Sequence, residues 1–341
     1  MVTKSRPKPP TQADVARAAG VSRTTVSYVL SNDGTVSIPD ETRQRVRDVV
    51  RTLDYSPNRT AQRLRTQKTY TIAGIIEDIT NPFHPALERG IQDVAEQHGY
   101  DLIMYNTDAD PAKERKALDA ALRNRVDGVI GSFAAIDLDD FGSLLAAEIP
   151  MVWLTGQPPV RSLPGLDVVY VDNVRAAHRA VSYLAERGHS RIAMLAGHGH
   201  PQQDRLIGYR QALEDHGLAA PDDYVQGQRF SIEEGKRAMG ALLALETRPT
   251  GVFGASDLLA VGAILAIKEA GLRIPEDIAV VGFDNILVAE VVTPALTTVA
   301  LNQAALGHRC GELLFERIQG LAPEQSRAVE MPFELVIRAS A

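Results

Sequence analysis

Cysteine is nearly absent from this chain, since Cys310 is the only one among 341 residues. A single cysteine excludes an intramolecular disulfide framework and is typical of a reducing cytosol. No run of 18 apolar residues occurs, which argues against a membrane-spanning helix. Residues 1–9 are basic and lead into no apolar region, so we expect a disordered arm rather than a secretory signal. These features together predict a cytoplasmic protein.

Signatures of catalysis and of bound cofactors are also missing. The sequence contains no glycine-rich phosphate loop, no Ser-His-Asp order and no paired acids that stand out. His198 and His200 follow an apolar run, but no third ligand stands at metal-binding spacing, so we expect them to line a cleft or to be solvated. We therefore expect no enzyme, no cofactor and no metal site.

Charge is divided unevenly along the chain, whose net charge is −7. Residues 1–68 carry 13 Lys and Arg against 6 Asp and Glu, a net charge of +7. The remainder carries 23 against 37, a net charge of −14. A basic head on an acidic body is typical of a protein that touches DNA with one end only.

Residues 11–31, TQADVARAAGVSRTTVSYVLS, predict a helix-turn-helix. Thr11 can cap a first helix with an apolar face, and Gly20 suits the left-handed residue that ends it. The expected apolar face consists of Val15, Ala18 and Ala19. Ser22 can cap a second helix with Val26, Val29 and Leu30 turned inward. Its outward side is polar and basic, which suits base edges and phosphates in a major groove.

Two further helices are predicted before residue 69. Residues 39–53 have an apolar stripe and acidic residues at the start, which indicates a third, packing helix. Residues 59–66, capped by Asn58, form a short basic helix whose apolar side is only Ala61 and Leu64. Such a helix is marginal alone. It is either an ordinary linker or a hinge that folds against DNA, with Leu64 inserted between base steps in the minor groove.

From residue 70 onward, apolar strands alternate with amphipathic helices. This pattern is typical of parallel sheets covered by helices, and there are too many units for one sheet. We therefore predict a body of two doubly wound α/β subdomains, with a ligand at the carboxyl ends of the strands. The expected strands are 71–76, 102–106, 128–132, 151–154, 168–171, 192–196, 252–255 and 278–282. The expected helices include 85–98, 111–124, 173–187, 203–216, 232–245 and 258–270.

Eight blocks in order carry a resemblance to a known family. They are DVARAAGVSRTTVSYVLS, YSPNRTAQRL, NPF from Asn81, DRLIGYRQAL from Asp204, SDLLAVGAI from Ser256, VVGFDN from Val280, PALTTVALN from Pro294 and the terminal FELVIRAS. With these blocks the chain resembles the lactose/galactose repressor family of bacterial transcription regulators over essentially its whole length. The resemblance implies a helix-turn-helix head and a periplasmic-binding-protein-like body.

The resemblance also implies domain limits. We expect a DNA-binding domain at 10–57, a hinge at 58–68 and an effector-binding and dimerisation domain at 69–341. Within the last, the N-subdomain covers about 69–167 and 299–328, and the C-subdomain about 168–298 and 329–341. Since no heptad-repeat tail follows the last strand, we expect a homodimer rather than a tetramer built through such a tail.

Site residues follow from the same comparison of motifs. Those assigned to DNA contact are Thr11, Ser22, Arg23, Thr24, Thr25, Ser27, Tyr28, Asn58, Arg59, Ala61 and Leu64. Those assigned to the effector are Phe83, His84, Thr155, Arg205, Phe230, Ser256, Asp257 and Asp284. Thr155 stands where some sugar-responsive members carry an acid, so the hydroxyl pattern of the ligand cannot be transferred from one relative.

The residues themselves leave alternatives open. Arg205 could form a surface ion pair, Phe83 and Phe230 could be core aromatics, and Asp257 could simply cap a helix. An Arg donor and an Asp acceptor across a cleft can instead hold vicinal hydroxyls, while an aromatic face stacks on a sugar ring or a planar base.

We expect a DNA-binding regulator, a repressor, that binds a pseudo-palindromic operator under control of a small ligand such as a sugar. The alternatives are a two-lobed sugar- or nucleobase-binding protein without a regulatory role and a doubly wound enzyme. The DNA-binding head argues against the first, and the lack of a catalytic set argues against the second. The sequence does not distinguish an inducer from a co-repressor.

Overall fold

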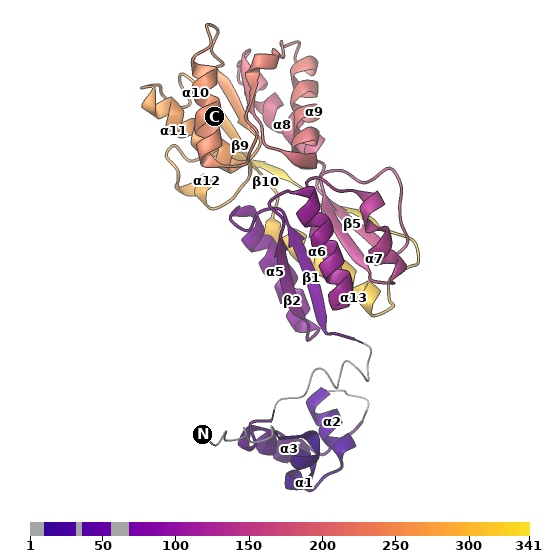
Figure 1. The fold of residues 1–341 in the computed structure, drawn as a ribbon. Helices are drawn as coiled ribbons and strands as arrows, with labels where there is room; N and C mark the ends of the chain where they lie inside the picture. Colours follow the sequence, from indigo (N-terminus) through magenta and orange to yellow (C-terminus); the bar gives the residue numbers. More distant parts are fainter. Residues whose placement is uncertain (1–9, 32–35, 56–67) are drawn as a thin grey trace, which may run out of the picture. The chain divides into compact units, whose positions relative to one another are not determined.

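The computed structural model describes residues 10–31, 36–55 and 68–341, in two compact units (Figure 1). An N-terminal head ends at Thr69, and a body extends from Tyr70 to Ala341. The expected hinge residues Asn58, Arg59, Ala61 and Leu64 lie outside the described residues. In the described part of the chain, no helix is both long and apolar enough to cross a membrane.

The head contains three described helices, α1 (Gln12–Ala19), α2 (Arg23–Ser31) and α3 (Asp40–Thr52). Thr11 caps α1 as predicted: its hydroxyl accepts from the Asp14 backbone N–H at 3.4 Å, and its own backbone N–H donates to the Asp14 carboxylate at 2.9 Å. Gly20 ends the helix in the left-handed conformation, with φ of 64°. Both ends of α1 are therefore specified by single residues.

Small apolar side chains form the core of the head. Its buried members are Val15, Ala16, Ala19, Val26, Val29 and Val46. The expected inward position of Ala18 is wrong, because Ala18 is exposed and Ala16 is buried instead. Ala16 precedes Ala19 by three residues and so shares its face. The guanidinium of Arg45 donates to the Ala19 carbonyl at 3.0 Å and ties α3 to the end of α1.

The body contains two six-stranded sheets. The first has the order β11-β5-β4-β3-β1-β2, and all its strands are parallel. Its strands are β1 (Thr71–Ile76), β2 (Asp101–Asn106), β3 (Gly128–Ser132), β4 (Met151–Thr155), β5 (Leu166–Tyr170) and β11 (Ala328–Glu330). Its helices are α5 (Phe83–Gln97), α6 (Pro111–Asn124), α7 (Gly142–Ala146) and α13 (Gln303–Ile318), with a 3₁₀ turn η1 (Leu138–Phe141). This half is the N-subdomain.

The second sheet has the order β12-β10-β9-β8-β6-β7, and only its edge strand β12 runs antiparallel. Its strands are β6 (Ile192–Leu195), β7 (Val225–Gln226), β8 (Gly251–Gly254), β9 (Ala279–Asp284), β10 (Thr297–Ala300) and β12 (Glu334–Val336). Its helices are α8 (Asn173–Glu186), α9 (Gly199–Asp215), α10 (Ile232–Leu243), α11 (Asp257–Glu269) and α12 (Val288–Val291), with a 3₁₀ turn η2 (Asp222–Tyr224). This half is the C-subdomain.

The chain passes between the subdomains at three places: after β5, after β10 and after β11. The expected boundaries at about 167, 298 and 328 each fall inside one of these strands and are therefore a few residues too early. The chain leaves a sheet only where its pairing ends, near residues 171, 301 and 331. In Figure 1, α13 accordingly lies beside α5, more than 200 residues earlier in the sequence.

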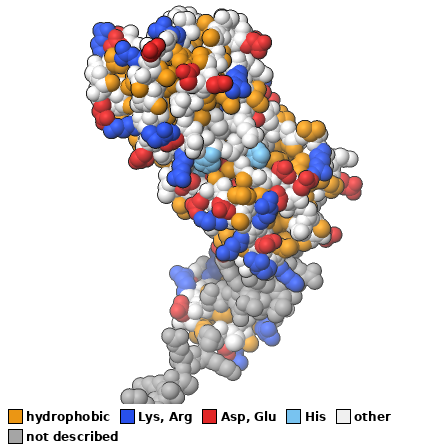
Figure 2. Space-filling view, turned by 45° about the horizontal axis from the view of Figure 1, so that its top comes forward, with side chains coloured by type: hydrophobic (Ala, Val, Ile, Leu, Met, Phe, Trp, Pro, Cys, Tyr) orange, Lys and Arg blue, Asp and Glu red, His pale blue; other side chains and the backbone are white. Residues whose placement is uncertain are grey.

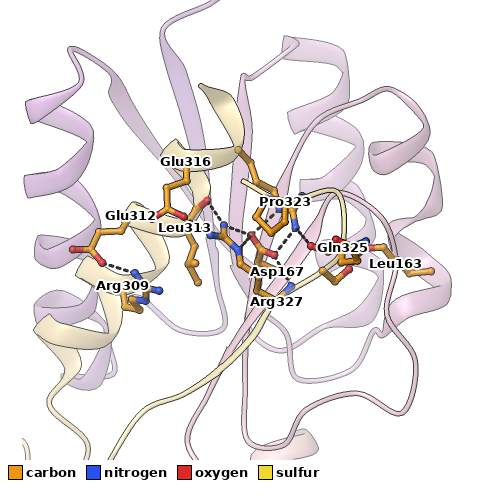
Figure 3. Close-up of polar contacts among 11 residues, drawn as sticks. Leu163, Asp167, Arg309, Glu312, Leu313, Glu316, Pro323, Gln325 and Arg327 are labelled. Atoms are coloured by element: carbon orange, nitrogen blue, oxygen red, sulfur yellow. Dashed lines mark hydrogen bonds and ion pairs between the residues drawn. The ribbon is translucent and has the colours of Figure 1, made fainter. Parts of the chain in front are cut away.

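A buried carboxylate fastens the returning segment to the N-subdomain (Figure 3). Asp167 of β5 is fully buried and accepts hydrogen bonds from Arg317 of α13 at 2.6 and 2.7 Å and from Arg327 at 2.7 Å. Burial alone would raise the pKa of Asp167, but the hydrogen bonds from the two arginines outweigh it and hold the pKa below the usual range. The carboxylate stays charged and paired.

Two helices begin earlier than predicted, and for the same reason. α5 begins at Phe83 rather than residue 85, and α9 begins at Gly199 rather than residue 203. Each carries a proline, Pro85 or Pro201, inside its first turn, where the missing N–H costs no helical hydrogen bond. The sequence shows the proline but not which residue of the first turn it occupies.

Candidate functional site

The outer side of α2 is the candidate DNA-contacting face of the head. Ser22 supports its start, because its hydroxyl accepts a hydrogen bond from the Thr25 N–H at 3.0 Å and lies 2.8 Å from the Thr25 hydroxyl. Arg23 and Thr24 at the first turn are exposed, while Thr25, Ser27 and Tyr28 are half-buried. The start of a helix with exposed Arg and Thr side chains can present donors and acceptors to base edges.

A cleft in the body lies between the two subdomains. Its empty volume is about 740 Å³, part of it open to solvent. Seven of the eight predicted effector residues line it: Phe83, His84, Thr155, Arg205, Phe230, Ser256 and Asp284. Figure 2 shows histidine side chains at the waist between the two lobes, while charges of both signs are scattered over the rest of that face.

The strand order explains why these residues meet. In the N-subdomain, the direction of strand addition reverses between β1 and β3, and in the C-subdomain it reverses between β6 and β8. A crevice opens at the carboxyl edge of a sheet at such a switch point. Glu77 and Ser132 flank the first switch point, and Arg205 and Ser256 follow the strands at the second. The cleft is therefore lined from two facing switch points.

Arg205 and Asp284 form the charged centre of the C-subdomain wall. Arg205 is only 7% exposed, so it is not a surface ion-pair residue. Its Nη2 lies 3.7 Å from Asp284 Oδ1, it donates to the Ala255 carbonyl, and its guanidinium stacks 3.9 Å from the Phe283 ring centre. Burial raises the pKa of Asp284 to about 7, although Arg205 opposes the shift. The pair offers a donor and an acceptor to one ligand.

Asp257 is the predicted effector residue that does not line the cleft. It is fully buried and accepts from the Ile286 N–H at 2.8 Å and from the Thr298 hydroxyl at 2.5 Å. It is not the helix cap either, since Ser256 caps α11 by accepting from the Leu259 N–H at 3.3 Å. Asp257 instead fixes the loop that follows β9, and Asp284 is the last residue of that strand.

The two aromatic residues lie on opposite walls. Phe83 begins α5 and Phe230 precedes α10, and both are half-buried and line the cleft. His84, next to Phe83, is buried, and burial lowers its pKa to about 4, so it is neutral at pH 7. His84 Nδ1, His200 Nε2 and Arg205 Nε have no hydrogen-bond partner within the described residues. A ligand in the cleft can satisfy such polar atoms.

Several residues that line the cleft were not singled out from the sequence. They are Glu77, Asn81, Ser132 and Asn173, among others. Glu77 and Ser132 stand at the carboxyl ends of predicted strands, which is the available signal for them. Asn81 accepts from the Phe83 N–H at 3.1 Å and so shapes the start of α5.

A loop of the N-subdomain touches the opposite subdomain at the edge of the cleft. The fully buried Glu114 holds this loop by accepting the N–H groups of Ala134, Ala135 and Ile136 at 2.8, 3.2 and 3.0 Å. The Ala134 carbonyl accepts from the His200 N–H of α9 at 3.2 Å. The two walls are thus in direct contact.

The histidines near α9 have no metal-binding companions. Throughout residues 10–31, 36–55 and 68–341, no group of three or more His, Cys, Asp or Glu is placed to hold a metal ion. His200 lines the cleft, and His198 packs at 5.3 Å against the Phe230 ring. Both histidines therefore belong to the surroundings of the cleft.

Comparison with known proteins gives two family matches and close full-length relatives. Residues 11–58 match bacterial regulatory proteins of the lacI family, and residues 181–341 match the periplasmic binding protein-like domain. The chain is 36% identical over 332 residues to the HTH-type transcriptional regulator DegA of Bacillus subtilis (strain 168), covering 96% of both chains.

Solved structures agree over nearly the whole length. A lac repressor dimer bound to operator and the anti-inducer ONPF has a TM-score of 0.83 and 27% identity, covering 98% of this chain and 99% of that one. A transcriptional regulator CelR–cellobiose complex has a TM-score of 0.71 and 30% identity, covering 97% and 100%. The chain belongs to the lacI family of bacterial regulatory proteins, and is a DNA-binding transcriptional repressor with a ligand-binding domain.

Proposed function

We propose that the protein binds a pseudo-palindromic operator as a homodimer, and that a sugar in the cleft controls this binding. The observation that carries the proposal is the presence in one chain of an exposed Arg23–Thr24 face and of a cleft with the buried pair Arg205 and Asp284. The first suits base edges, and the second suits vicinal hydroxyls.

Twofold symmetry is part of the proposal because one helix-turn-helix covers only half a site. A dimer places two recognition helices about one helical turn apart on DNA, and its operator is then a near-palindrome. The lac repressor in its operator complex is a dimer. The segment 58–68, with Leu64 as a wedge into the minor groove at the centre, is the proposed hinge.

A sugar is the proposed ligand because the cleft combines a ring-stacking face with hydroxyl-binding groups. Phe230 supplies the apolar face, and the unpartnered atoms of His84, Arg205 and His200 supply polar contacts. The related CelR structure holds cellobiose. Ligand binding across the two subdomains changes how they close, and closure changes the spacing of the two hinges in the dimer.

Selection of duplex DNA from a random pool by the purified full chain, at stated salt, tests the proposal. Enrichment of a twofold symmetric site supports it and supplies the probe for ligand screening. The selection is repeated with candidate sugars present, because a protein whose effector is a co-repressor binds its operator only together with that effector. Lack of enrichment in every arm contradicts the proposal and favours a two-lobed ligand-binding protein without a regulatory role.

A further inference from the structure

Glu77 is the least compensated charge in the cleft. Three charged side chains are found among the described lining residues: Glu77, Arg205 and Asp284. The charge of Arg205 is already engaged by Asp284, the Ala255 carbonyl and the Phe283 ring. Glu77 lies on the opposite wall and accepts one weak hydrogen bond within the described residues, from the Ser132 hydroxyl at 3.3 Å.

Two carboxylates and one guanidinium, which is itself paired with Asp284, act on Glu77. Burial, together with the nearby carboxylates Glu114 and Asp284, raises its pKa to about 7, while Ser132 and Arg205 oppose the shift. Glu114 is also a carboxylate and cannot neutralise the charge of Glu77. Its oxygens accept three backbone N–H groups. A cationic group of a ligand would therefore be stabilised next to Glu77 on the N-subdomain wall.

The position of Glu77 suits contact with a ligand rather than a role in stabilising the fold. It follows β1 at the switch point and lines the cleft, and no basic side chain of the described lining residues lies on its own wall. The neighbouring His84 is neutral at pH 7 and cannot serve as the counter-ion. A half-buried carboxylate of this kind is costly in the empty cleft and gains most from a charged donor.

We propose that Glu77 selects a sugar that carries a protonated amino group, so that the effector is an amino sugar. The inference deepens the proposed function and depends on the cleft being the effector site. The ammonium group donates to the Glu77 carboxylate, Arg205 and Asp284 hold hydroxyl groups on the other wall, and Phe230 covers a face of the ring. Thr155 at the end of β4 is neutral and leaves Glu77 as the acid of this wall.

Calorimetric titration of the full chain at pH 7.5 tests this assignment. The probes are glucosamine, galactosamine, 3-amino-3-deoxyglucose and 6-amino-6-deoxyglucose, each compared with its parent hexose and its N-acetyl derivative. We expect an amino sugar to bind about 10- to 100-fold more tightly than both neutral forms, as is typical of a charge-assisted hydrogen bond. N-acetylation keeps the ring and removes the charge, so this comparison requires no variant.

Two variants then assign the preference to one residue. Glu77→Gln keeps the size of the side chain and removes its charge, and should bring the amine-to-neutral ratio close to one. Glu246→Gln removes the same charge from the exposed loop before β8. This loop precedes a strand of the second sheet, whereas the cleft lies at the carboxyl ends of the strands, so the variant should leave the ratio unchanged. Equal binding of the neutral sugars, a preference that survives Glu77→Gln, or failure of every amine to bind overturns the assignment.

Operator binding by the same preparations separates this inference from the proposed function. If the selected operator is bound and a neutral sugar changes its affinity, the repressor proposal stands and the amino-sugar assignment fails. If the selection yields no operator, the repressor proposal fails whatever the sugars show.

Discussion

At the scale of single residues, Glu77 should make the stability of the body depend on pH. Its pKa is raised from 4.5 to about 7 in the folded body, which therefore holds the proton more tightly than the unfolded chain does. The wild type then loses stability as the pH rises through this window. Glutamine does not titrate, so Glu77→Gln should gain about 2 kcal/mol relative to the wild type between pH 5 and pH 8.

Urea unfolding at several pH values measures this difference. The fluorescence of Trp153 reports on the body alone, because it is the single tryptophan of the chain and is buried in β4. Glu246→Gln serves as the control and should follow the wild type at every pH. A difference between Glu77→Gln and the wild type that does not change with pH contradicts the prediction.

Two arginines of the head should affect DNA binding in different ways. Arg23 is exposed at the start of α2, the proposed base-contacting end, so Arg23→Ala should cost about 1–3 kcal/mol on the selected site and change the preferred base at one position. Arg63 lies in the basic segment that we propose as the hinge, and Arg63→Ala should weaken all sequences alike and lower the salt slope by about one.

Titration of the selected operator and of scrambled duplexes at several salt concentrations separates these effects. The prediction for Arg23 is wrong if its variant keeps the same base preferences, and the prediction for Arg63 is wrong if its variant loses affinity for the operator alone.

The cleft shows how far single residues can be predicted from sequence. Arg205 and Asp284 are found from the motifs that contain them, and the structure places them 3.7 Å apart. Glu77 is the first of two adjacent acids after an apolar run, and its partner Ser132 belongs to another strand. Sheet order, which the sequence does not state, brings the two together.

At the scale of elements, the contact between α5 and α13 depends on glycine. A Cβ added at Gly307 of α13 would lie 1.9 Å from the Leu87 carbonyl oxygen of α5, and backbone cannot yield as a side chain does. Gly307→Ala should therefore destabilise the body by about 1–3 kcal/mol. Gly240 of α10 has nothing within 4 Å of such an atom, so Gly240→Ala should stabilise it by about 0.5–1 kcal/mol.

Urea unfolding followed by Trp153 fluorescence measures both changes in the free energy of unfolding. Since both substitutions add one methyl group to a helical glycine, their opposite signs isolate the effect of packing from that of helix propensity. A stabilised Gly307→Ala variant would show that the two helices can separate without cost.

Element prediction succeeds where a signal is local and fails where it is not. Thr11 and Gly20 delimit α1 because capping depends on neighbours in sequence. β10 was missed because Thr297 and Thr298 read as polar, although both are fully buried. Their hydroxyls donate to the Arg338 carbonyl and to Asp257, partners that lie about 40 residues away.

At the scale of the whole molecule, the alternation of strands and helices predicts two subdomains, but not where the chain crosses between them. The crossings follow β5, β10 and β11, and the segment that returns to the N-subdomain after β10 is secured by the contacts of Arg317 and Arg327 with Asp167. These contacts join residues about 150 positions apart, so no local pattern announces them.

In the proposed function, the effector site in the cleft is coupled to the DNA-binding head, and thermodynamic linkage makes this coupling reciprocal. We expect saturating effector either to raise or to lower the operator affinity by about 5- to 150-fold, which corresponds to a coupling free energy of about 1–3 kcal/mol. Saturating operator must change effector affinity in the same sense, because the coupling free energy is shared by the two sites.

The proposed dimer is tested by comparing two factors: the change in operator affinity caused by the effector, and the change in effector affinity caused by the operator. If one chain binds one operator, the operator should shift effector affinity by the factor that the effector imposes on operator affinity. If two chains with equivalent clefts bind one operator, the factor for the operator is the product of two equal factors, so an effect of about 25-fold on the operator corresponds to about 5-fold at each cleft. Anisotropy titrations of labelled operator and calorimetric titrations of effector, at one salt concentration, give both numbers. Equal factors would contradict the dimer, while a square relation supports two coupled clefts on one operator.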